Sequence, residues 1–296
     1  MRKSWLPAYI ALGLIWGCSF IFIELGLEFL TPFGVAFGRC ALGAITLLTV
    51  VKVRKISLPK ERSAWQKLWI VALLLNVVPG ILFAFAQQYV TSVLAGIINA
   101  TTPLMTMIFM LVLFREQKLK SEQIIGLFIG AFGVMVVLGI WKGIGDNQLL
   151  GVVALLLAVS CYGFSFPFTI RNIVPLGLKP EAAATVQLCM AAITLLPLYL
   201  FDGISDDNFQ LTPLLAMLAL GVFGSGFAYI WNFSIIAAAG GSIASTVTYI
   251  TPVVAVFVGW LFLGEPITWH EVVGAILVIL GAAITQGRLK RKAVSS

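Results

Sequence analysis

Charged residues are scarce in this chain. Asp, Glu, Lys and Arg make up 10% of its 296 residues, whereas a soluble domain carries about a quarter. Hydrophobic residues make up 60% of the chain. Too few charges remain to cover a water-exposed surface, which excludes a soluble enzyme or binding module. The composition therefore predicts an integral membrane protein that contacts the lipid bilayer.

The residues and motifs of common catalytic and metal sites are also missing. His270 is the only histidine, and the four cysteines lie inside apolar runs without a CxxC pair. The cysteines are therefore predicted to be small buried hydrophobic residues. HExxH and GxxxxGK[ST] are absent, so ATP is not expected to supply energy directly through this chain. We expect no enzyme activity, no catalytic residue, no metal and no cofactor.

Long apolar runs dominate the sequence instead. They are continuous rather than alternating and about 20 residues long, which indicates helices and not a β-barrel. The sequence predicts an all-α integral membrane protein with ten transmembrane helices. The expected spans are residues 5–27, 33–51, 68–90, 94–114, 123–141, 149–170, 181–200, 213–236, 243–263 and 271–287.

The basic residues indicate the orientation. The net charge is +7, but Lys and Arg lie in short gaps between apolar runs, so no nucleic-acid partner is expected. With the N-terminus in the cytoplasm, every Lys and Arg except Lys142 and Arg39 falls in a cytoplasmic segment. This distribution predicts a multi-pass protein of the plasma (inner) membrane with both termini in the cytoplasm. Met1-Arg-Lys resembles the start of a signal peptide, but no small-residue cleavage site follows, so a first membrane helix is predicted.

The chain contains an internal repeat. Residues 95–116 return in altered form as residues 244–265, with Pro103 aligned on Pro252 and Glu116 on Glu265. We therefore predict two five-helix repeats, residues 1–145 and 146–296. Because five is odd, the second repeat must cross the membrane in the opposite direction to the first. Inverted-topology repeats of this kind are typical of secondary transporters, whose substrate site lies near the membrane midplane.

Two ionisable residues lie deep inside apolar runs, Glu24 in the first span and Arg39 in the second. Their expected depths differ by a few ångströms, within reach of an arginine side chain. An unpaired charge at this depth is costly, so a partner or a watery cavity is expected. Two interpretations stay open. In the structural interpretation, the two residues form an ion pair, or Glu24 extends to the membrane interface. In the functional interpretation, they bind the two ends of a zwitterion, or Glu24 carries a coupling proton.

Neutral polar and aromatic residues form a second group of candidates within the spans. Asn99 and Thr248 occupy matched repeat positions, as do Gln88 and Asn232, and Tyr249 adjoins Thr248. These side chains either line a shared cavity or link helices by hydrogen bonds. The same choice between cavity lining and packing applies to the aromatic residues Trp16, Phe20, Tyr162 and Tyr229.

Matched prolines interrupt the fourth span of each repeat. Pro103 and Pro252 each remove a backbone hydrogen bond from their helix and bend it. They are candidate hinges between rocking halves, with static curvature as the alternative.

Several motifs occur in the same order in both repeats. They are Trp16-Gly, Ser19-Phe20 and Thr102-Pro103 with Glu116 in the first repeat, and Gly163, Ser165-Phe166, Thr251-Pro252 and Gly264-Glu265-Pro266 in the second; Arg39 of the first repeat adds to them. In this respect residues 5–287 resemble the drug/metabolite transporter superfamily and, within it, an EamA-type permease. The resemblance implies a plasma-membrane exporter of small metabolites such as amino acids, with a central cavity and coupling to a proton or other gradient. Gln187 stands where Arg39 stands in the first repeat, so a charge-dependent role would be one-sided.

The leading hypothesis is a secondary transporter that exports small polar or amphipathic solutes by alternating access, with proton coupling as one form. An uncoupled facilitative carrier is the alternative, and a membrane enzyme for lipid-linked substrates would need a catalytic cluster that the sequence lacks. The last span of each repeat is expected to brace a monomer or join a homodimer. The candidate substrate-binding residues are Trp16, Ser19, Phe20, Glu24, Arg39, Gln88, Asn99, Tyr162, Tyr229, Asn232, Thr248 and Tyr249.

Overall fold

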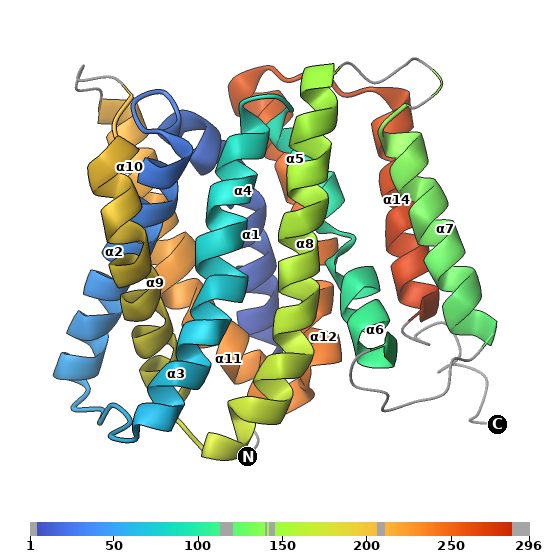
Figure 1. The fold of residues 1–296 in the computed structure, drawn as a ribbon. Helices are drawn as coiled ribbons and strands as arrows, with labels where there is room; N and C mark the ends of the chain where they lie inside the picture. Colours follow the sequence, from blue (N-terminus) through green and yellow to red (C-terminus); the bar gives the residue numbers. More distant parts are fainter. Residues whose placement is uncertain (1–4, 113–120, 140, 142–145, 206–210, 286–296) are drawn as a thin grey trace.

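The computed structural model describes residues 5–112, 121–139, 141, 146–205 and 211–285, and these residues are almost entirely helical (Figure 1). Among these described residues, eight helical stretches are long and apolar enough to cross a membrane. Two shorter apolar helices, Ile124–Val137 and Trp269–Ile284, fall in the runs predicted at 123–141 and 271–287. The expected helices are therefore present, and these two are shorter than the other eight. Glu116, Lys142 and the basic residues near the C-terminus lie outside the described residues.

The first half of the chain contains five of these apolar stretches. Two of them consist of consecutive segments: α3, η1 and α4 form the third stretch, and α5 and α6 form the fourth. The bounds are α1 (Leu6–Gly26), α2 (Pro32–Val53), α3 (Arg62–Ala72), the π-helical η1 (Leu73–Val77), α4 (Val78–Gln87), α5 (Ser92–Asn99), α6 (Thr102–Val112) and α7 (Ser121–Val137).

The second half is interrupted at similar places. Its third stretch joins α10, the π-helical η4 and α11, and its fourth runs from α12 through a 3-10 segment, η5, to α13 and η6. The bounds are α8 (Asp146–Asn172), η3 (Val174–Leu176), α9 (Pro180–Asp202), α10 (Leu211–Ala219), η4 (Leu220–Phe227), α11 (Ala228–Ala239), α12 (Gly241–Ser245), η5 (Thr246–Tyr249), α13 (Thr251–Val258), η6 (Gly259–Leu263) and α14 (Trp269–Thr285).

Local sequence explains where several helices begin and end. The Thr31 hydroxyl accepts a hydrogen bond from the Gly34 amide at 3.3 Å, and the following Pro32 suits the first helical turn of α2. Thr91 caps α5 in the same way through the Leu94 amide. At the far end of η6, Gly264 adopts a left-handed conformation with φ 64°, which glycine tolerates without a steric penalty.

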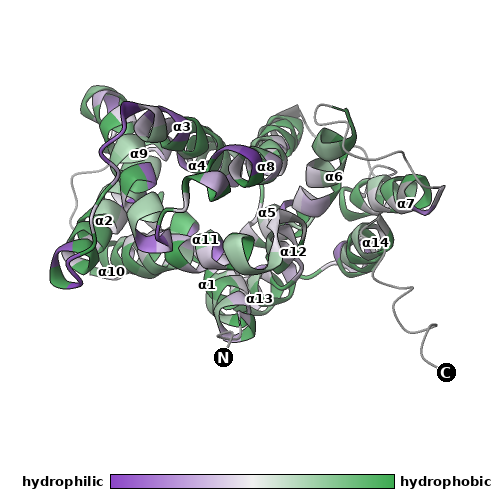
Figure 2. Ribbon diagram, turned by 90° about the horizontal axis from the view of Figure 1, so that it is seen from below, coloured by the Kyte–Doolittle hydropathy of each residue, from purple (hydrophilic) through white to green (hydrophobic). Residues whose placement is uncertain are grey.

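The helices pack across the boundary between the two halves. Helix α2 lies along α9, α4 and α6 both contact α8, and α7 pairs with α14 at one side of the molecule (Figure 1). Hydrophobic residues occur on most of the helices, including the peripheral α7, α10 and α14 (Figure 2). This pattern is expected of helices whose outer faces contact lipid.

Glycine allows two of these helix pairs to approach closely at matched positions. A Cβ atom at Gly17 of α1 would lie 2.4 Å from the Cβ atom of Val254 in α13. Its counterpart Gly163 of α8 would place a Cβ atom 2.5 Å from the Cβ atom of Met105 in α6. The first long helix of each half thus crosses the proline-containing helix of the other half at van der Waals distance, as small residues permit.

Candidate functional site

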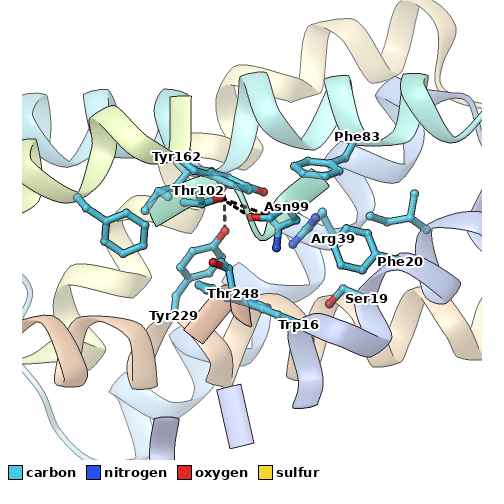
Figure 3. A pocket seen from close by; sticks show the side chains of 13 residues that line it. Trp16, Ser19, Phe20, Arg39, Phe83, Asn99, Thr102, Tyr162, Tyr229 and Thr248 are labelled. Atoms are coloured by element: carbon cyan, nitrogen blue, oxygen red, sulfur yellow. Dashed lines mark hydrogen bonds between the residues drawn. The ribbon is translucent and has the colours of Figure 1, made fainter. Parts of the chain in front are cut away.

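A cavity of about 50 Å³ lies between helices of both halves. Trp16, near the middle of α1, and Tyr162 of α8 lie on its wall (Figure 3). A water molecule needs about 10–15 Å³ by this kind of measure, so the cavity holds only a few waters as it stands. The residues that line it are Trp16, Ser19, Phe20, Ile23, Arg39, Leu75, Phe83, Asn99, Thr102, Tyr162, Phe166, Tyr229 and Thr248.

Aromatic rings form most of the wall. Phe83 stacks on Tyr162 with ring centroids 5.7 Å apart, and Phe20 contacts the same Phe83 ring at 5.7 Å. Trp16 meets Tyr229 edge to face, with centroids 6.0 Å apart. Such rings offer apolar contact area and polarisable faces to a bound organic solute. The wall is therefore suited to an apolar or amphipathic body rather than to a strongly hydrated ion.

Irregular backbone holds two of these rings in place. The Tyr229 hydroxyl donates to the Leu75 carbonyl in η1 at 3.0 Å, and the Trp16 indole N–H donates to the Gly224 carbonyl in η4 at 3.2 Å. A π-helical segment shifts the regular hydrogen-bond pattern and leaves carbonyl groups available to side chains. The π-helical segments η1 and η4 thus each supply an acceptor to an aromatic residue of the cavity.

The two proline-containing spans meet beside the cavity. Thr102 donates to the Asn99 carbonyl at 2.7 Å, and the matched Thr251 donates to the Thr248 carbonyl at 2.8 Å. Pro103 and Pro252 follow these threonines, so the threonine hydroxyls occupy carbonyl groups where each helix is interrupted. The Asn99 amide donates to the Thr251 hydroxyl at 3.2 Å and joins the two interruptions.

Arg39 is the one ionisable side chain with a formal charge at neutral pH among the lining residues. Its side chain is only 6% exposed, and its Nε donates to the Ser225 hydroxyl of η4 at 3.2 Å. Within the described part of the chain, no carboxylate pairs with it; the ion pair found there joins Arg54 and Glu181. The Arg39 guanidinium points into the cavity near Asn99 (Figure 3).

A neutral contact joins the corresponding elements in the other half. Gln187, which corresponds to Arg39, donates to the Asn76 side-chain oxygen, and Asn76 lies in η1 as Ser225 lies in η4. Both contacts join a second span to a π-helical segment of the opposite half. The cavity therefore receives its positive charge from one half only.

Glu24 does not pair with Arg39. The Gln87 amide of α4 donates to a Glu24 carboxylate oxygen at 3.2 Å and to the Phe20 carbonyl at 2.9 Å. Glu24 lies outside the cavity lining, near the end of α1. The expected depths of Glu24 and Arg39 were similar, but their side chains have different neighbours.

Three other candidates also lie outside the lining. Gln88 is exposed, and its neighbour Gln87 is the buried glutamine, because successive residues of a helix face different directions. Asn232 is fully buried, and both polar atoms of its amide group lack a hydrogen-bond partner among the described residues. Tyr249 in η5 does not contribute to the wall. Eight of the twelve candidates line the cavity: Trp16, Ser19, Phe20, Arg39, Asn99, Tyr162, Tyr229 and Thr248.

The wall also includes residues that the sequence did not single out as candidates. Thr102 and Phe166 belong to the repeated motifs, so the repeat carried a signal for them. Ile23, Leu75 and Phe83 are ordinary hydrophobic residues of apolar runs, and only the packing distinguishes them from lipid-facing positions. The described residues contain no cluster of three or more His, Cys, Asp or Glu side chains that could hold a metal ion.

Each end of α1 makes a hydrogen bond to another span: Glu24 near its end bonds to Gln87 of α4, and Tyr9 near its start bonds to the second half. Near the start of α1, the Tyr9 hydroxyl shares a hydrogen bond of 2.7 Å with the Thr246 hydroxyl of η5.

A further contact joins the two halves at α5. The carboxylate of Glu265 accepts hydrogen bonds from the amides of Ser92 and Val93, at 2.8 and 2.9 Å, and from the Ser92 hydroxyl at 3.0 Å. We call this contact the Glu265 clasp.

Comparison with known proteins identifies a consistent group. The model of the EamA-like transporter family matches residues 3–139 and 149–286. The uncharacterized transporter YoaV of Bacillus subtilis is 23% identical over 96% of this chain and 97% of its own length. The uncharacterized inner membrane transporter YedA of Escherichia coli K12 is 28% identical over 93% of this chain and 90% of its own length. A crystal structure with 19% sequence identity has the same fold, with a TM-score of 0.70 over 98% of this chain and all of that one.

Proposed function

Because the chain belongs to the EamA-like transporter family, which makes it a multi-span membrane transporter, we propose that it exports small metabolites by alternating access. The substrates are amino acids or similar polar or amphipathic solutes, and the membrane is the plasma membrane. The observation that carries the proposal is the cavity that residues of both halves enclose. A site between two halves is where a rocking carrier must bind its substrate.

The proposal includes ten membrane helices in two inverted repeats, residues 1–145 and 146–296, with both termini in the cytoplasm. The matched contacts support it. Gly17 approaches α13 as Gly163 approaches α6, and the Arg39–Ser225 contact has its counterpart in Gln187–Asn76. An axis that exchanges the two halves would produce such pairs.

Alternating access requires contacts that break when one side opens. A cavity of about 50 Å³ is too small for an amino acid, so the described conformation is a closed one in this proposal. The Glu265 clasp and the Tyr9–Thr246 hydrogen bond each join elements of different halves and would open in turn. Pro103 and Pro252 follow the two helix interruptions and would act as hinges there.

Glu24 is the residue proposed to carry a coupling proton. It is half-buried, and its carboxylate accepts one hydrogen bond, from Gln87. A protonated Glu24 would carry no charge and would fit this apolar environment better. Glu24→Gln should therefore abolish the response of transport to a pH gradient while transport down a substrate gradient persists. If the variant responds as the wild type does, Glu24 does not couple the proton, and an uncoupled carrier becomes the better explanation.

The direct test is transport by the purified protein in liposomes. A panel of radiolabelled amino acids and small organic acids would be measured with and without a proton gradient, and protein-free liposomes would be the control. Saturable, protein-dependent flux of at least one solute is the expected result. Failure of every class of solute, in protein that remains folded, would contradict the proposal.

A further inference from the structure

The unused hydrogen-bond donors of the cavity indicate what it binds. Most polar donors on the wall are already occupied within the protein. Ser19 donates to the Ile15 carbonyl, Thr102 to the Asn99 carbonyl and Thr248 to the Ser245 carbonyl. The Trp16 and Tyr229 donors are used by the π-helical segments. A ligand must therefore be recognised mainly by the donors that remain.

Arg39, Tyr162 and Asn99 retain free donors among the residues that the structure describes, Asn99 because its amide group has a second N–H beside the one that it donates to Thr251. The Arg39 guanidinium uses its Nε, and its two terminal nitrogens make no hydrogen bond or ion pair to those residues. The Tyr162 ring stacks on Phe83, and the Tyr162 hydroxyl makes no hydrogen bond to the described residues. The Tyr162 hydroxyl and the Arg39 guanidinium both point toward Asn99 (Figure 3). The free donors are therefore on the same side of the cavity.

The charge of the site gives the sign of the ligand. Arg39 is 6% exposed and lacks a carboxylate partner within the described residues, and the cavity wall contains no acidic side chain. Removing a cation from water without compensation is unfavourable, and a bound anion would compensate it. The planar guanidinium binds a carboxylate with two parallel hydrogen bonds, a geometry that lysine cannot reproduce.

We propose that the cavity binds organic carboxylates: Arg39 and Tyr162 hold the carboxylate group, and the rings of Phe20, Phe83 and Trp16 contact the apolar part of the ligand. This inference rests on the proposed function for the location of the site and specifies its substrate class. Uncharged amides and positively charged amines of the same shape bind weakly, because neither supplies a counterion to the Arg39 charge.

Binding can be tested separately from transport. The thermal stability of the detergent-purified protein would be measured with 3-phenylpropanoate, 3-phenylpropanamide or 3-phenylpropylamine, which differ in the charge of one end. A ligand that binds the folded protein raises the melting temperature, and the rise grows with the ligand concentration relative to its Kd. We expect a concentration-dependent rise with the carboxylate and no comparable rise with the amide or the amine. Equal shifts with all three compounds, or a larger shift with the amine, would overturn the proposal.

Substitutions identify the residues responsible. Arg39→Gln should weaken 3-phenylpropanoate binding about 30-fold, the lower range for removing one partner of a buried charged pair. Arg39→Lys should retain part of the affinity, and Tyr162→Phe should weaken binding about tenfold through one charge-assisted hydrogen bond. Arg54→Gln is the matched control, because Arg54 pairs with Glu181 outside the cavity. Its affinity should equal that of the wild type.

A structural role for Arg39 predicts a different outcome. If Arg39 only stabilised the fold, Arg39→Gln would lower the melting temperature without ligand. In the proposal the ligand-free variant is at least as stable as the wild type, because an unpaired buried cation has been removed. Transport distinguishes the two proposals: a transported solute whose flux is undiminished in Arg39→Gln overturns the carboxylate site and leaves the carrier intact. Arg39-dependent binding without any flux overturns the carrier and leaves the site.

Discussion

The Glu265 clasp makes a quantitative prediction about alternating access. Its carboxylate accepts three hydrogen bonds at the start of α5, where the helix dipole also favours a negative charge. Glu265→Gln keeps the shape and one oxygen acceptor but places an amide N–H₂ group either against the Ser92 amide or against the Val93 amide and the Ser92 hydroxyl. The loss of one hydrogen bond to a charged group, for a partly exposed side chain, amounts to about 2 kcal/mol. If the clasp forms only in the closed conformation, the population open at this end should rise about 30-fold.

Labelling of a cavity cysteine would measure that population. Ser19 lies on the wall and is 5% exposed, so Ser19→Cys, in a background with the four native cysteines replaced by alanine, should react with a membrane-impermeant maleimide only after opening. We expect Glu265→Gln to increase the labelling rate about 30-fold. Glu271→Gln is the matched control, because the Glu271 carboxylate accepts hydrogen bonds from Thr268, three residues away in the same half. Its labelling rate should not change. A lower melting temperature without faster labelling in Glu265→Gln would mean that the clasp stabilises every conformation and is not a gate.

Two further predictions concern packing and helix phase. Gln87→Ala should lower the melting temperature, because it leaves the Glu24 carboxylate without its hydrogen bond. The neighbouring Gln88→Ala, at an exposed position, should change the free energy of unfolding by less than about 0.5 kcal/mol. Equal effects of the two substitutions in thermal unfolding would contradict the assignment of Gln87 as the partner of Glu24. Gly281→Ala should destabilise the protein by about 1–3 kcal/mol, because the alanine Cβ atom would lie 2.4 Å from the Gly130 amide nitrogen in α7. An unchanged melting temperature would show that α7 and α14 can separate at no cost.

The sequence predicts the helices well because the bilayer imposes strong constraints on length and composition. The predicted gap near Thr91 lies between the observed α4 and α5, and the predicted gap near Ala239 lies between α11 and α12. The π-helical segments could not be predicted. Leu73–Val77 is an ordinary apolar sequence, and the contact of its Leu75 carbonyl with Tyr229 depends on a residue 154 positions away. Local sequence contains no signal for such a distant partner.

The candidate site was predictable to the extent that it follows from the repeat. Aligned motifs lead to Trp16, Tyr162, Asn99 and Thr248, all of which line the cavity. Depth in the membrane was a weaker guide, because it does not specify the direction in which a side chain points. Glu24 was assigned to the site on depth alone, and its carboxylate binds Gln87 outside the lining. The partners of Glu265, 172 and 173 residues earlier in the chain, required the tertiary structure.

The difference between the halves suggests how one binding site can serve two conformations. The Arg39–Ser225 and Gln187–Asn76 contacts each join the second span of one half to the π-helical segment of the other, so the two halves pack on each other through corresponding elements. A second arginine in place of Gln187 would put two like charges near one cavity, and their repulsion would be large in a membrane. A single arginine avoids that repulsion and leaves one uncompensated charge for the ligand. In our proposal, the related packing of the halves therefore permits the rocking motion, and the unequal charge determines what is carried.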